Sequence, residues 1–280
     1  MRWVEGQTSA GPTPVLGVVG LGRMARALLL PLLEAHQLSP DQVAGVVAGE
    51  GSARTLSQDL GVAVTTDPER AWQAPLVLLA VKPQQLEQVA AEAVEADHDP
   101  QAPPPLLVSV LAGVRLERLQ RLFPLRRCVR AVPNTPCLVR SGLTGLAWGE
   151  GLAPEQREQV LRLFAPVGEV MELPEGQLDA FLALTSSGPA YVALIAEALA
   201  DGAVAAGLPR VLAAHLAHRT LAGTAALLKE RELHPGQLKD MVSSPAGTTI
   251  AGLRELERAG VRSALIEAVV AAAERSRALA

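Results

Sequence analysis

The sequence predicts an α/β protein whose first half is a doubly wound parallel sheet and whose second half is entirely helical. Three observations lead to this expectation. Short apolar runs of strand length alternate with helical patterns from residue 15 to about residue 173. The first run ends in a glycine-rich turn that opens a helix. After Leu178 the strand pattern stops, and long runs rich in Ala and Leu continue. We therefore expect one domain over residues 1–174, with residues 1–14 as a loose extension, and a helical domain over residues 175–280.

Composition limits the function classes. Apolar residues make up 49% of the 280 residues but aromatic residues only 2%, so Ala, Leu and Val must build the core. Small side chains give each helix little to bury alone, and we therefore expect the helices to pack against a second copy of the chain. The net charge is −4 and no cluster of Lys and Arg stands out, which argues against a nucleic-acid partner.

The chain also lacks membrane, export and metal signals. No apolar run approaches the length of a membrane span, and residues 1–14 lack the apolar stretch of a signal peptide. Cys128 and Cys137 are the only cysteines, too few and wrongly spaced for a zinc site or a redox pair. We expect buried free thiols, no bound metal and a cytoplasmic protein.

The first strand and its turn carry a nucleotide signal. Residues 15–20 form the apolar run VLGVVG, and four leucines between residues 28 and 33 follow at helical spacing. In the intervening G-x-G-x-x-A motif, Gly20 permits a sharp turn, Gly22 lets the backbone approach a pyrophosphate and Ala25 lets the helix press against the strand. This context predicts a Rossmann-type dinucleotide site. Its expected contacts are Gly20, Leu21, Gly22, Arg23, Met24 and Ala25.

The second strand, residues 43–48, lies at the distance that a βαβ unit requires, and the residues at its end should choose the coenzyme. An acid there binds the ribose hydroxyls of NAD, and Glu50 meets that description. A 2′-phosphate instead needs small polar groups and a cation, which Ser52 and Arg54 supply. We favour NADP(H), keep NAD(H) as the alternative, and expect Ala48 to contact the coenzyme.

The fourth strand, residues 76–81, runs into Ala80, Val81, Lys82 and Pro83. The carboxyl ends of strands face the coenzyme in doubly wound sheets, so Lys82 is expected near the ribose or nicotinamide edge, unless it is an ordinary surface lysine. The other predicted elements of this half are strands over residues 62–65, 106–111, 128–132, 143–148 and 167–173, helices over residues 53–60, 68–72, 84–94 and 154–164, and a proline-rich surface loop at residues 100–105.

In the second half the stretch HPGQLKDMVSSPAGTTI, residues 234–250, interrupts helices predicted over residues 185–206, 209–229, 249–259 and 261–279. Pro245 disfavours helical geometry at Ser244, so the preceding helix should end near Val242. Ser and Thr residues before the next apolar run are typical N-caps. The new helix N-terminus would offer free backbone N–H groups to a carboxylate or phosphate, although an ordinary interhelical connection is the alternative.

Taken together, these segments resemble the Δ1-pyrroline-5-carboxylate reductase family. The resemblance covers nearly the whole chain from residue 15 and is strongest at SSGPAYVALIAEALADGAVAAGLPR, residues 186–210, and at residues 234–250. It implies an NAD(P)H-dependent oxidoreductase that reduces the C=N bond of L-1-pyrroline-5-carboxylate to L-proline, the last step of proline biosynthesis. It also implies an intertwined helical homodimer, with dimers that often assemble into decamers.

The resemblance places the substrate ring in the loop before Ile250. Backbone N–H groups there would hold the substrate carboxylate, and the Thr249 hydroxyl would hydrogen-bond the ring nitrogen, which makes Thr249 the expected catalytic residue. Glu175 falls at a family position near the substrate. The implied substrate contacts are Glu175, Ser244, Ala246, Gly247, Thr248 and Thr249. The implied coenzyme contacts beyond the glycine turn are Ala80, Val81, Lys82, Pro83, Val110, Leu111, Ala112 and Gly113.

Three positions depart from the family pattern. Asp67 stands where many members carry Asn and either weakens contacts on the adenine side or caps the next helix. Met241 replaces a polar residue, and Ala246 stands where Gly is usual. None of these departures removes the implied chemistry, for which the glycine turn and the late loop, donated by a second subunit, are expected to meet in one cleft.

Two other readings remain. A β-hydroxyacid dehydrogenase, or another imine reductase, would share the two-part layout, but the dehydrogenase class carries a catalytic Lys in the first helix after the boundary. Residues 187–206 contain no Lys. A nucleotide-binding sensor or scaffold without turnover would be expected to lose Thr249 or the Ser244-Pro245 turn, and both are present.

Overall fold

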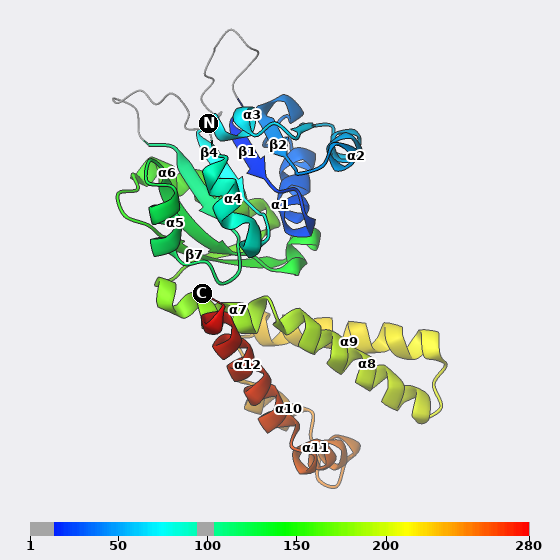
Figure 1. Cartoon of the computed structure of the whole chain (residues 1–280). Helices are drawn as coiled ribbons and strands as arrows, with labels where there is room; N and C mark the ends of the chain where they lie inside the picture. Colours follow the sequence, from blue (N-terminus) through cyan, green and yellow to red (C-terminus); the bar gives the residue numbers. More distant parts are fainter. Residues whose placement is uncertain (1–13, 94–103, 280) are drawn as a thin grey trace. The chain divides into compact units, whose positions relative to one another are not determined.

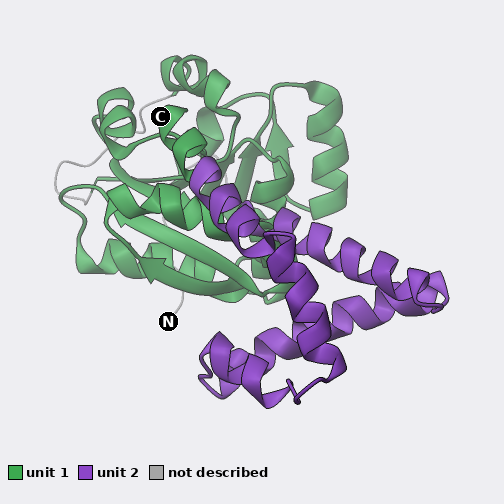
Figure 2. Ribbon diagram, turned by 90° about the horizontal axis from the view of Figure 1, so that it is seen from below, with its two compact units in different colours: residues 1–186, 273–280 green, residues 187–272 purple. Residues whose placement is uncertain are grey.

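The computed structural model describes residues 14–93 and 104–279, which form two compact units. The sheet unit contains the described residues up to Ser186 and those from Ala273 onward, and the helical unit spans Ser187–Ala272 (Figures 1 and 2). The expected N-terminal extension and the proline-rich loop, apart from Pro14, Pro104 and Pro105, lie outside the described residues.

The sheet unit is built on eight strands in the order β3-β2-β1-β4-β5-β6-β7-β8. The first six run parallel, and the strand order reverses between β1 and β4, where doubly wound sheets open a ligand crevice. The strands are Leu16–Val19 (β1), Val43–Val46 (β2), Ala63–Thr65 (β3), Leu76–Leu79 (β4), Leu106–Ser109 (β5), Arg127–Val132 (β6), Gly142–Trp148 (β7) and Gly168–Glu172 (β8).

The sheet is mostly parallel, as the alternation of strands and helices predicts, but its direction reverses once, between β6 and β7. β7 runs antiparallel to β6, with Val129 opposite Trp148, and β8 runs parallel to β7. Only a short segment containing the 3-10 turn Thr135–Val139 separates β6 from β7. A parallel neighbour would need a crossover of a dozen or more residues, so the chain turns back on itself here.

Helices cover both faces of the sheet, as the doubly wound prediction requires. One face packs against α1 (Arg23–Glu34), α2 (Glu50–Leu60) and α6 (Pro154–Phe164). The other packs against α3 (Glu69–Trp72), α4 (Leu86–Ala91), α5 (Leu116–Leu122) and α7 (Leu178–Thr185). No helix was predicted over α5, and none with the bounds of α7. The predicted helix over α2 began three residues too late, and the one over α4 extended to residue 94, which is not described.

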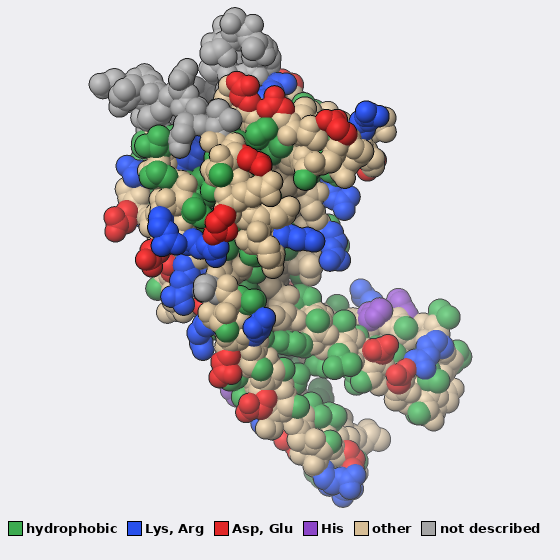
Figure 3. Space-filling model, in the orientation of Figure 1, with side chains coloured by type: hydrophobic (Ala, Val, Ile, Leu, Met, Phe, Trp, Pro, Cys, Tyr) green, Lys and Arg blue, Asp and Glu red, His purple; other side chains and the backbone are tan. Residues whose placement is uncertain are grey.

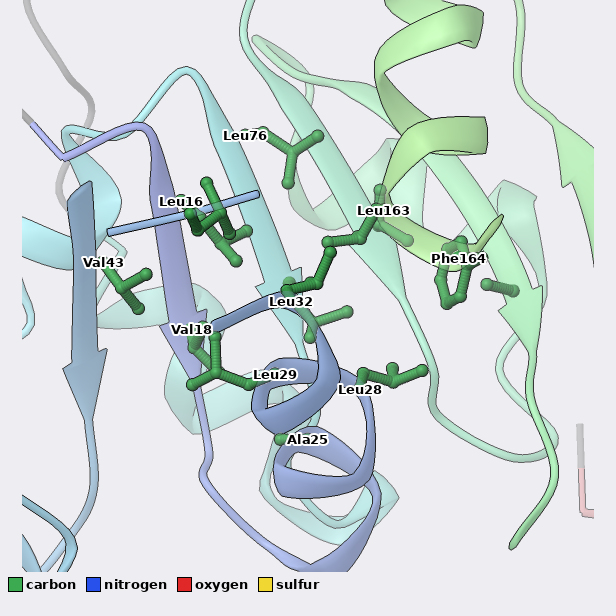
Figure 4. Close-up of a cluster of buried hydrophobic side chains, with 14 of the residues drawn as sticks. Leu16, Val18, Ala25, Leu28, Leu29, Leu32, Val43, Leu76, Leu163 and Phe164 are labelled. Atoms are coloured by element: carbon green, nitrogen blue, oxygen red, sulfur yellow. The ribbon is translucent and has the colours of Figure 1, made fainter. Parts of the chain in front are cut away.

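The core under α1 illustrates how side chains alternate between the two faces of the sheet along β1. Leu16 and Val18 point to one face, where they meet the leucines of α1, while Val19 belongs to the opposite cluster. Figure 4 shows Leu28, Leu29 and Leu32 lying between the strands and α6. Each of these leucines is almost fully buried, which contributes roughly 2 kcal/mol per side chain to folding.

The helical unit has little core of its own. It contains α8 (Gly188–Ala205), α9 (Arg210–Glu230), α10 (Pro235–Met241), α11 (Thr248–Arg258) and most of α12 (Val261–Ala278). The buried cluster between α8 and α9 consists of Ala200, Ala213 and Ala217. Large apolar side chains remain on the surface, as Figure 3 shows for one side. They include Val192, Leu194, Leu199, Val211, Leu212, Leu216, Ile266 and Val270.

One expectation about the helical half differs from the structure. The run Glu175–Ala205 has the length and the mean hydropathy, 1.4, of a helix that could cross a membrane, although no apolar run was expected to approach one. The structure breaks it into α7 and α8 at Ser186–Ser187. The two compact units divide after Ser186, and the end of α12 belongs to the sheet unit. The domain boundary after residue 174 stays a prediction.

Candidate coenzyme cleft and substrate loop

The glycine turn after β1 has the geometry that its motif predicts. Gly20 adopts a left-handed φ of +87°, and a side chain there would lie 2.9 Å from the backbone of Ala80. Gly22 is the N-cap of α1, and the space beside it is open. Ala25 is fully buried against the sheet. The turn thus leaves room for a bulky anion in front of the first N–H groups of α1.

A cleft of about 410 Å³ opens beside this turn, at the carboxyl ends of the central strands. Eight of the predicted coenzyme residues line it: Gly20, Leu21, Gly22, Ala48, Ser52, Ala80, Val81 and Lys82. The cleft therefore combines the ends of β1, β2 and β4, and Lys82 brings an exposed ammonium group to its rim.

Other predicted coenzyme residues do not line this cleft. They are Arg23, Met24, Ala25, Arg54, Asp67, Pro83, Val110, Leu111, Ala112 and Gly113. The last four form the start of the β5–α5 loop, beside the end of β4, because the N–H of Val110 donates to the carbonyl of Leu79. The lining also includes residues that were not predicted from the sequence, among them Thr66, Pro68, Trp72, Gln85, Gln88 and Val89.

Most of these unpredicted residues share a position shortly after a strand, which can be recognised only once the fold is known. Thr66 and Pro68 follow β3, and Gln85 and Gln88 follow β4. Both strands point their carboxyl ends to the same edge of the sheet, so residues just after them belong to the same site.

Two carboxylates near the cleft are held by polar groups. The Thr66 hydroxyl donates to Glu50 Oε1 over 2.6 Å. Asp67 accepts from the backbone N–H of Glu69 at the start of α3, at 3.0 Å. The capping role considered for Asp67 is therefore the one that the structure supports.

Glu175 lies in the sheet unit and its carboxylate has protein partners. Glu175 Oε1 accepts from the backbone N–H of Leu116 at 2.7 Å and from Arg130 at 3.3 Å. Arg130 also donates to Asp179 at 3.3 Å, and its side chain is only 1% exposed. Asp179 accepts a further bond, 2.7 Å long, from the hydroxyl of Ser276.

The loop in the helical unit has the predicted break. The helix α10 ends at Met241 with Val242 as its C-cap, and α11 begins at Thr248. The expectation of a Ser or Thr cap is wrong, since Gly247 is the N-cap and no side chain caps the helix. The N–H of Gly247 donates to the carbonyl of Ser244 at 3.0 Å, which closes the turn.

This closed turn leaves the first N–H groups of α11 without carbonyl partners inside the helix, as an anion site requires. Ala246 takes a left-handed φ of +56°, and the Ser243 hydroxyl is buried without a hydrogen-bond partner among the described residues. A pocket of about 550 Å³ adjoins the loop. It is lined by Lys239, Ala246, Gly247, Ile250, Ala251, Leu253, Arg254 and Glu257. The predicted substrate residues Ser244, in the loop, and Thr248 and Thr249, in the first turn of α11, lie outside this lining.

The two cysteines are free and buried. Burial raises the pKa of the Cys128 thiol to about 12, against a smaller opposite effect of Arg126 and Arg127. Burial also raises the pKa of Cys137. Within residues 14–93 and 104–279, no three His, Cys, Asp or Glu side chains gather to hold a metal ion.

The chain matches family models over both halves. Residues 175–279 match one described as pyrroline-5-carboxylate reductase dimerisation, and residues 15–113 match one described as NADP oxidoreductase, coenzyme F420-dependent. Pyrroline-5-carboxylate reductases from Synechocystis and Thermus thermophilus are 46% and 41% identical to the chain. Each alignment covers 94% of this chain, and 97% and 98% of the respective relative.

Solved structures agree with these matches. A pyrroline-5-carboxylate reductase from Coxiella burnetii superposes with a TM-score of 0.83 at 32% identity, covering 96% of this chain and 99% of the other. A pyrroline carboxylate reductase from Plasmodium falciparum, with NADP bound, gives 0.84 at 28% identity over 94% and 97%.

Proposed function

This chain belongs to the pyrroline-5-carboxylate reductase family, and we propose that it reduces L-1-pyrroline-5-carboxylate to L-proline with NAD(P)H, the last step of proline biosynthesis. The main support for this proposal is the match over nearly the full length of both this chain and its relatives. It includes the nucleotide turn and the late polar loop together.

The residues of the sheet unit fit a dinucleotide. The open space at Gly22, the left-handed Gly20 and the cleft over β1, β2 and β4 form a cradle that larger side chains would fill. When bound there, the reduced nicotinamide supplies the hydride for the C=N carbon. Gly20, Leu21 and Gly22 would hold the pyrophosphate, Ala48 and Ser52 the adenosine side, and Ala80 to Pro83 and Val110 to Gly113 the nicotinamide side.

NADPH is the proposed preferred coenzyme. Ser52 lines the cleft within the first turn of α2, whose leading N–H groups have no partner inside the helix and attract an anion. Arg54 follows in the same helix. Glu50, which would favour ribose hydroxyls, is hydrogen-bonded by Thr66. Asp67 is assigned to capping α3, although it stays near the adenosine side of the site.

The substrate is proposed to lie in the loop from Ser244 to Thr249. Backbone N–H groups of Ala246 and Thr248 would orient its carboxylate beside Gly247, whose own N–H already donates to Ser244. The Thr249 hydroxyl would hydrogen-bond the ring nitrogen while its charge changes. Orientation and a basic imine nitrogen suffice for this reaction, so no His–Asp pair is required. Glu175 remains a proposed neighbour of the substrate, although its carboxylate also binds Leu116 and Arg130.

We further propose an intertwined homodimer in which the loop of one subunit meets the coenzyme cleft of the other, with dimers associating into decamers. The apolar side chains exposed on α8, α9 and α12 support a partner surface, since large apolar patches rarely remain in water. The matched family model is itself described as dimerisation. A cytoplasmic location is proposed from the soluble biosynthetic character of the family.

The purified protein tests the reaction directly. NADPH and NADH oxidation is followed with and without pyrroline-5-carboxylate, and the product is identified as L-proline by chiral chromatography. Substrate-dependent oxidation with a higher kcat/KM for NADPH supports the proposal, whereas absence of turnover with both coenzymes overturns it. Light scattering after size exclusion gives the oligomer mass. A 3-hydroxyacid offered with NADP+ tests the dehydrogenase alternative, which the absence of Lys from α8 already disfavours.

A further inference from the structure

We propose that the last turn of α12 is a positioning element for the coenzyme site. On this proposal, Ser276 and Leu279 fix the β5–α5 loop at residues 110–115, and thereby the nicotinamide end of the cleft. The inference rests on the proposed function, because it concerns how tightly the same coenzyme is held.

The first contact is a close approach of two backbones. Gly113 has a φ of +73°, and a Cβ built on it would lie 3.0 Å from Leu279 Cβ and 3.2 Å from the Leu279 carbonyl oxygen. Leu279 follows directly after the end of α12. The last described residue therefore covers Gly113, and a side chain there would contact Leu279 more tightly than an ordinary van der Waals contact.

The second contact holds the other end of the same loop. Leu116 is the first residue of α5, and its N–H has no partner within that helix. Glu175 accepts this N–H at 2.7 Å, although the two residues are 59 positions apart. A carboxylate at a helix N-terminus is favoured by hydrogen bonding and by the helix dipole.

Buried charges connect these two contacts. Arg130 binds Glu175 and Asp179, both at 3.3 Å, and Asp179 accepts the Ser276 hydroxyl at 2.7 Å. Ser276, Asp179 and Arg130 are all at least 94% buried. The connections thus form a closed ring that runs from Leu116 through Glu175, Arg130, Asp179 and Ser276 to Leu279 and Gly113.

The loop inside this ring lies next to the cleft wall. Its first residue, Val110, is hydrogen-bonded to Leu79 at the end of β4, and the residues after Leu79 line the cleft. Between buried Leu111 and buried Gly113, Ala112 is exposed at the carboxyl edge of the sheet. Fixing both ends of the loop holds this exposed segment in place before the coenzyme arrives, which lowers the ordering cost of binding.

Ser276→Ala is the main test, measured as the Kd for NADPH by nicotinamide fluorescence without substrate, and then as separate KM and kcat values. Loss of one hydrogen bond to a charged group should raise the coenzyme Kd and KM about three- to tenfold. The value of kcat and the KM for pyrroline-5-carboxylate should stay within about twofold. Ser276→Thr retains the hydroxyl and should restore the Kd. Ser263→Ala, at an exposed site on the same helix, is the matched control.

Two further variants test the proposal even if the Ser276→Ala protein does not fold. A chain ending after Ala278 removes Leu279, and Gly113→Ala places a Cβ 3.0 Å from Leu279 Cβ. Each change alone should raise the Kd for NADPH. The double variant should raise it by less than the product of the two single increases, because the new Cβ at position 113 no longer meets Leu279.

An unchanged Kd in both Ser276→Ala and the shortened chain would overturn the proposal, as would a rise in Kd that Ser276→Thr does not reverse. Because binding is measured without substrate, a parent enzyme that binds NADPH but reduces no pyrroline-5-carboxylate would reject the proposed reaction and leave this result intact.

Discussion

The hydroxyl of Thr66, just after the third strand, donates a 2.6 Å hydrogen bond to Glu50 Oε1 at the start of α2. Thr66 itself lines the coenzyme cleft. The bond orients a carboxylate that would repel a 2′-phosphate at this end of the site.

Thr66→Val should shift coenzyme preference toward NADH. Without its hydrogen bond the Glu50 carboxylate can turn toward the adenosine side, so we expect the ratio of kcat/KM for NADPH to that for NADH to fall about threefold. Glu50→Gln should raise the same ratio, and the double variant should resemble Glu50→Gln alone. Steady-state kinetics with both coenzymes decide the matter, and a fall in the ratio for Glu50→Gln would contradict it.

Thr249→Ala should reduce kcat by roughly a hundredfold, because the group that hydrogen-bonds the ring nitrogen is lost. The Kd for NADPH and the melting temperature should stay close to those of the parent. Thr249→Ser keeps the hydroxyl and should recover most of the rate. Full proline formation by the alanine variant would remove Thr249 from the mechanism.

Arg130→Met should lower the free energy of unfolding by about 3–5 kcal/mol, because Glu175 and Asp179 then lose a buried cation. Arg140→Met is a suitable control. Its partner Glu34 is 2.8 Å away, but both side chains are more than half exposed, so the cost should be about 0.5 kcal/mol or less. Urea unfolding at one protein concentration compares the two, and equal effects would argue against a stabilising buried network.

Ala246→Gly should stabilise the protein by up to about 1 kcal/mol, because the left-handed backbone at this position is less favourable for alanine, which has a Cβ, than for glycine. Ala251→Gly, inside α11, should instead destabilise it by about 1 kcal/mol. Thermal unfolding of both variants measures the opposite signs. A lower melting temperature for Ala246→Gly would show that the loop does not need the freedom that glycine gives.

Cys128 should make stability fall at alkaline pH. The native pKa is raised to about 12 from an ordinary 9.0, so above about pH 9 the unfolded chain releases a proton that the native protein retains. The contribution of the Cys128 thiol to the free energy of unfolding is complete below pH 9 and decreases by at most about 1.4 kcal/mol per pH unit toward pH 12. The difference between the parent and Cys128→Ala, measured by urea unfolding across this range, isolates the thiol. Parallel curves would contradict the shift.

Local sequence patterns predicted most helices and strands, because these elements depend mainly on residues close to one another in the chain. The helix Pro154–Phe164 has the predicted bounds, and Gly20, Gly22 and Ala25 occupy the places that their motif requires. The direction of β7 could have been inferred from the short connection after β6, but alternation alone does not contain that information.

The rest of the site depends on contacts between distant residues. Thr66 and Gln85 reach one cleft only because parallel strands end at the same edge. The two bonds of Glu175 join it to Leu116 and Arg130, 59 and 45 positions away. No periodicity in the sequence specifies such pairs, and so the buried ring around Arg130 was not anticipated.

The helix α12 begins in one unit and ends in the other, which has a consequence for synthesis. Asp179 emerges from the ribosome nearly one hundred residues before Ser276, its hydroxyl partner. Until Ser276 and Leu279 have emerged, Asp179 has Arg130 as a partner but lacks its hydroxyl donor, and the loop at Gly113 is not covered by Leu279. The buried network around Arg130 is therefore completed only after the whole helical unit has been synthesised.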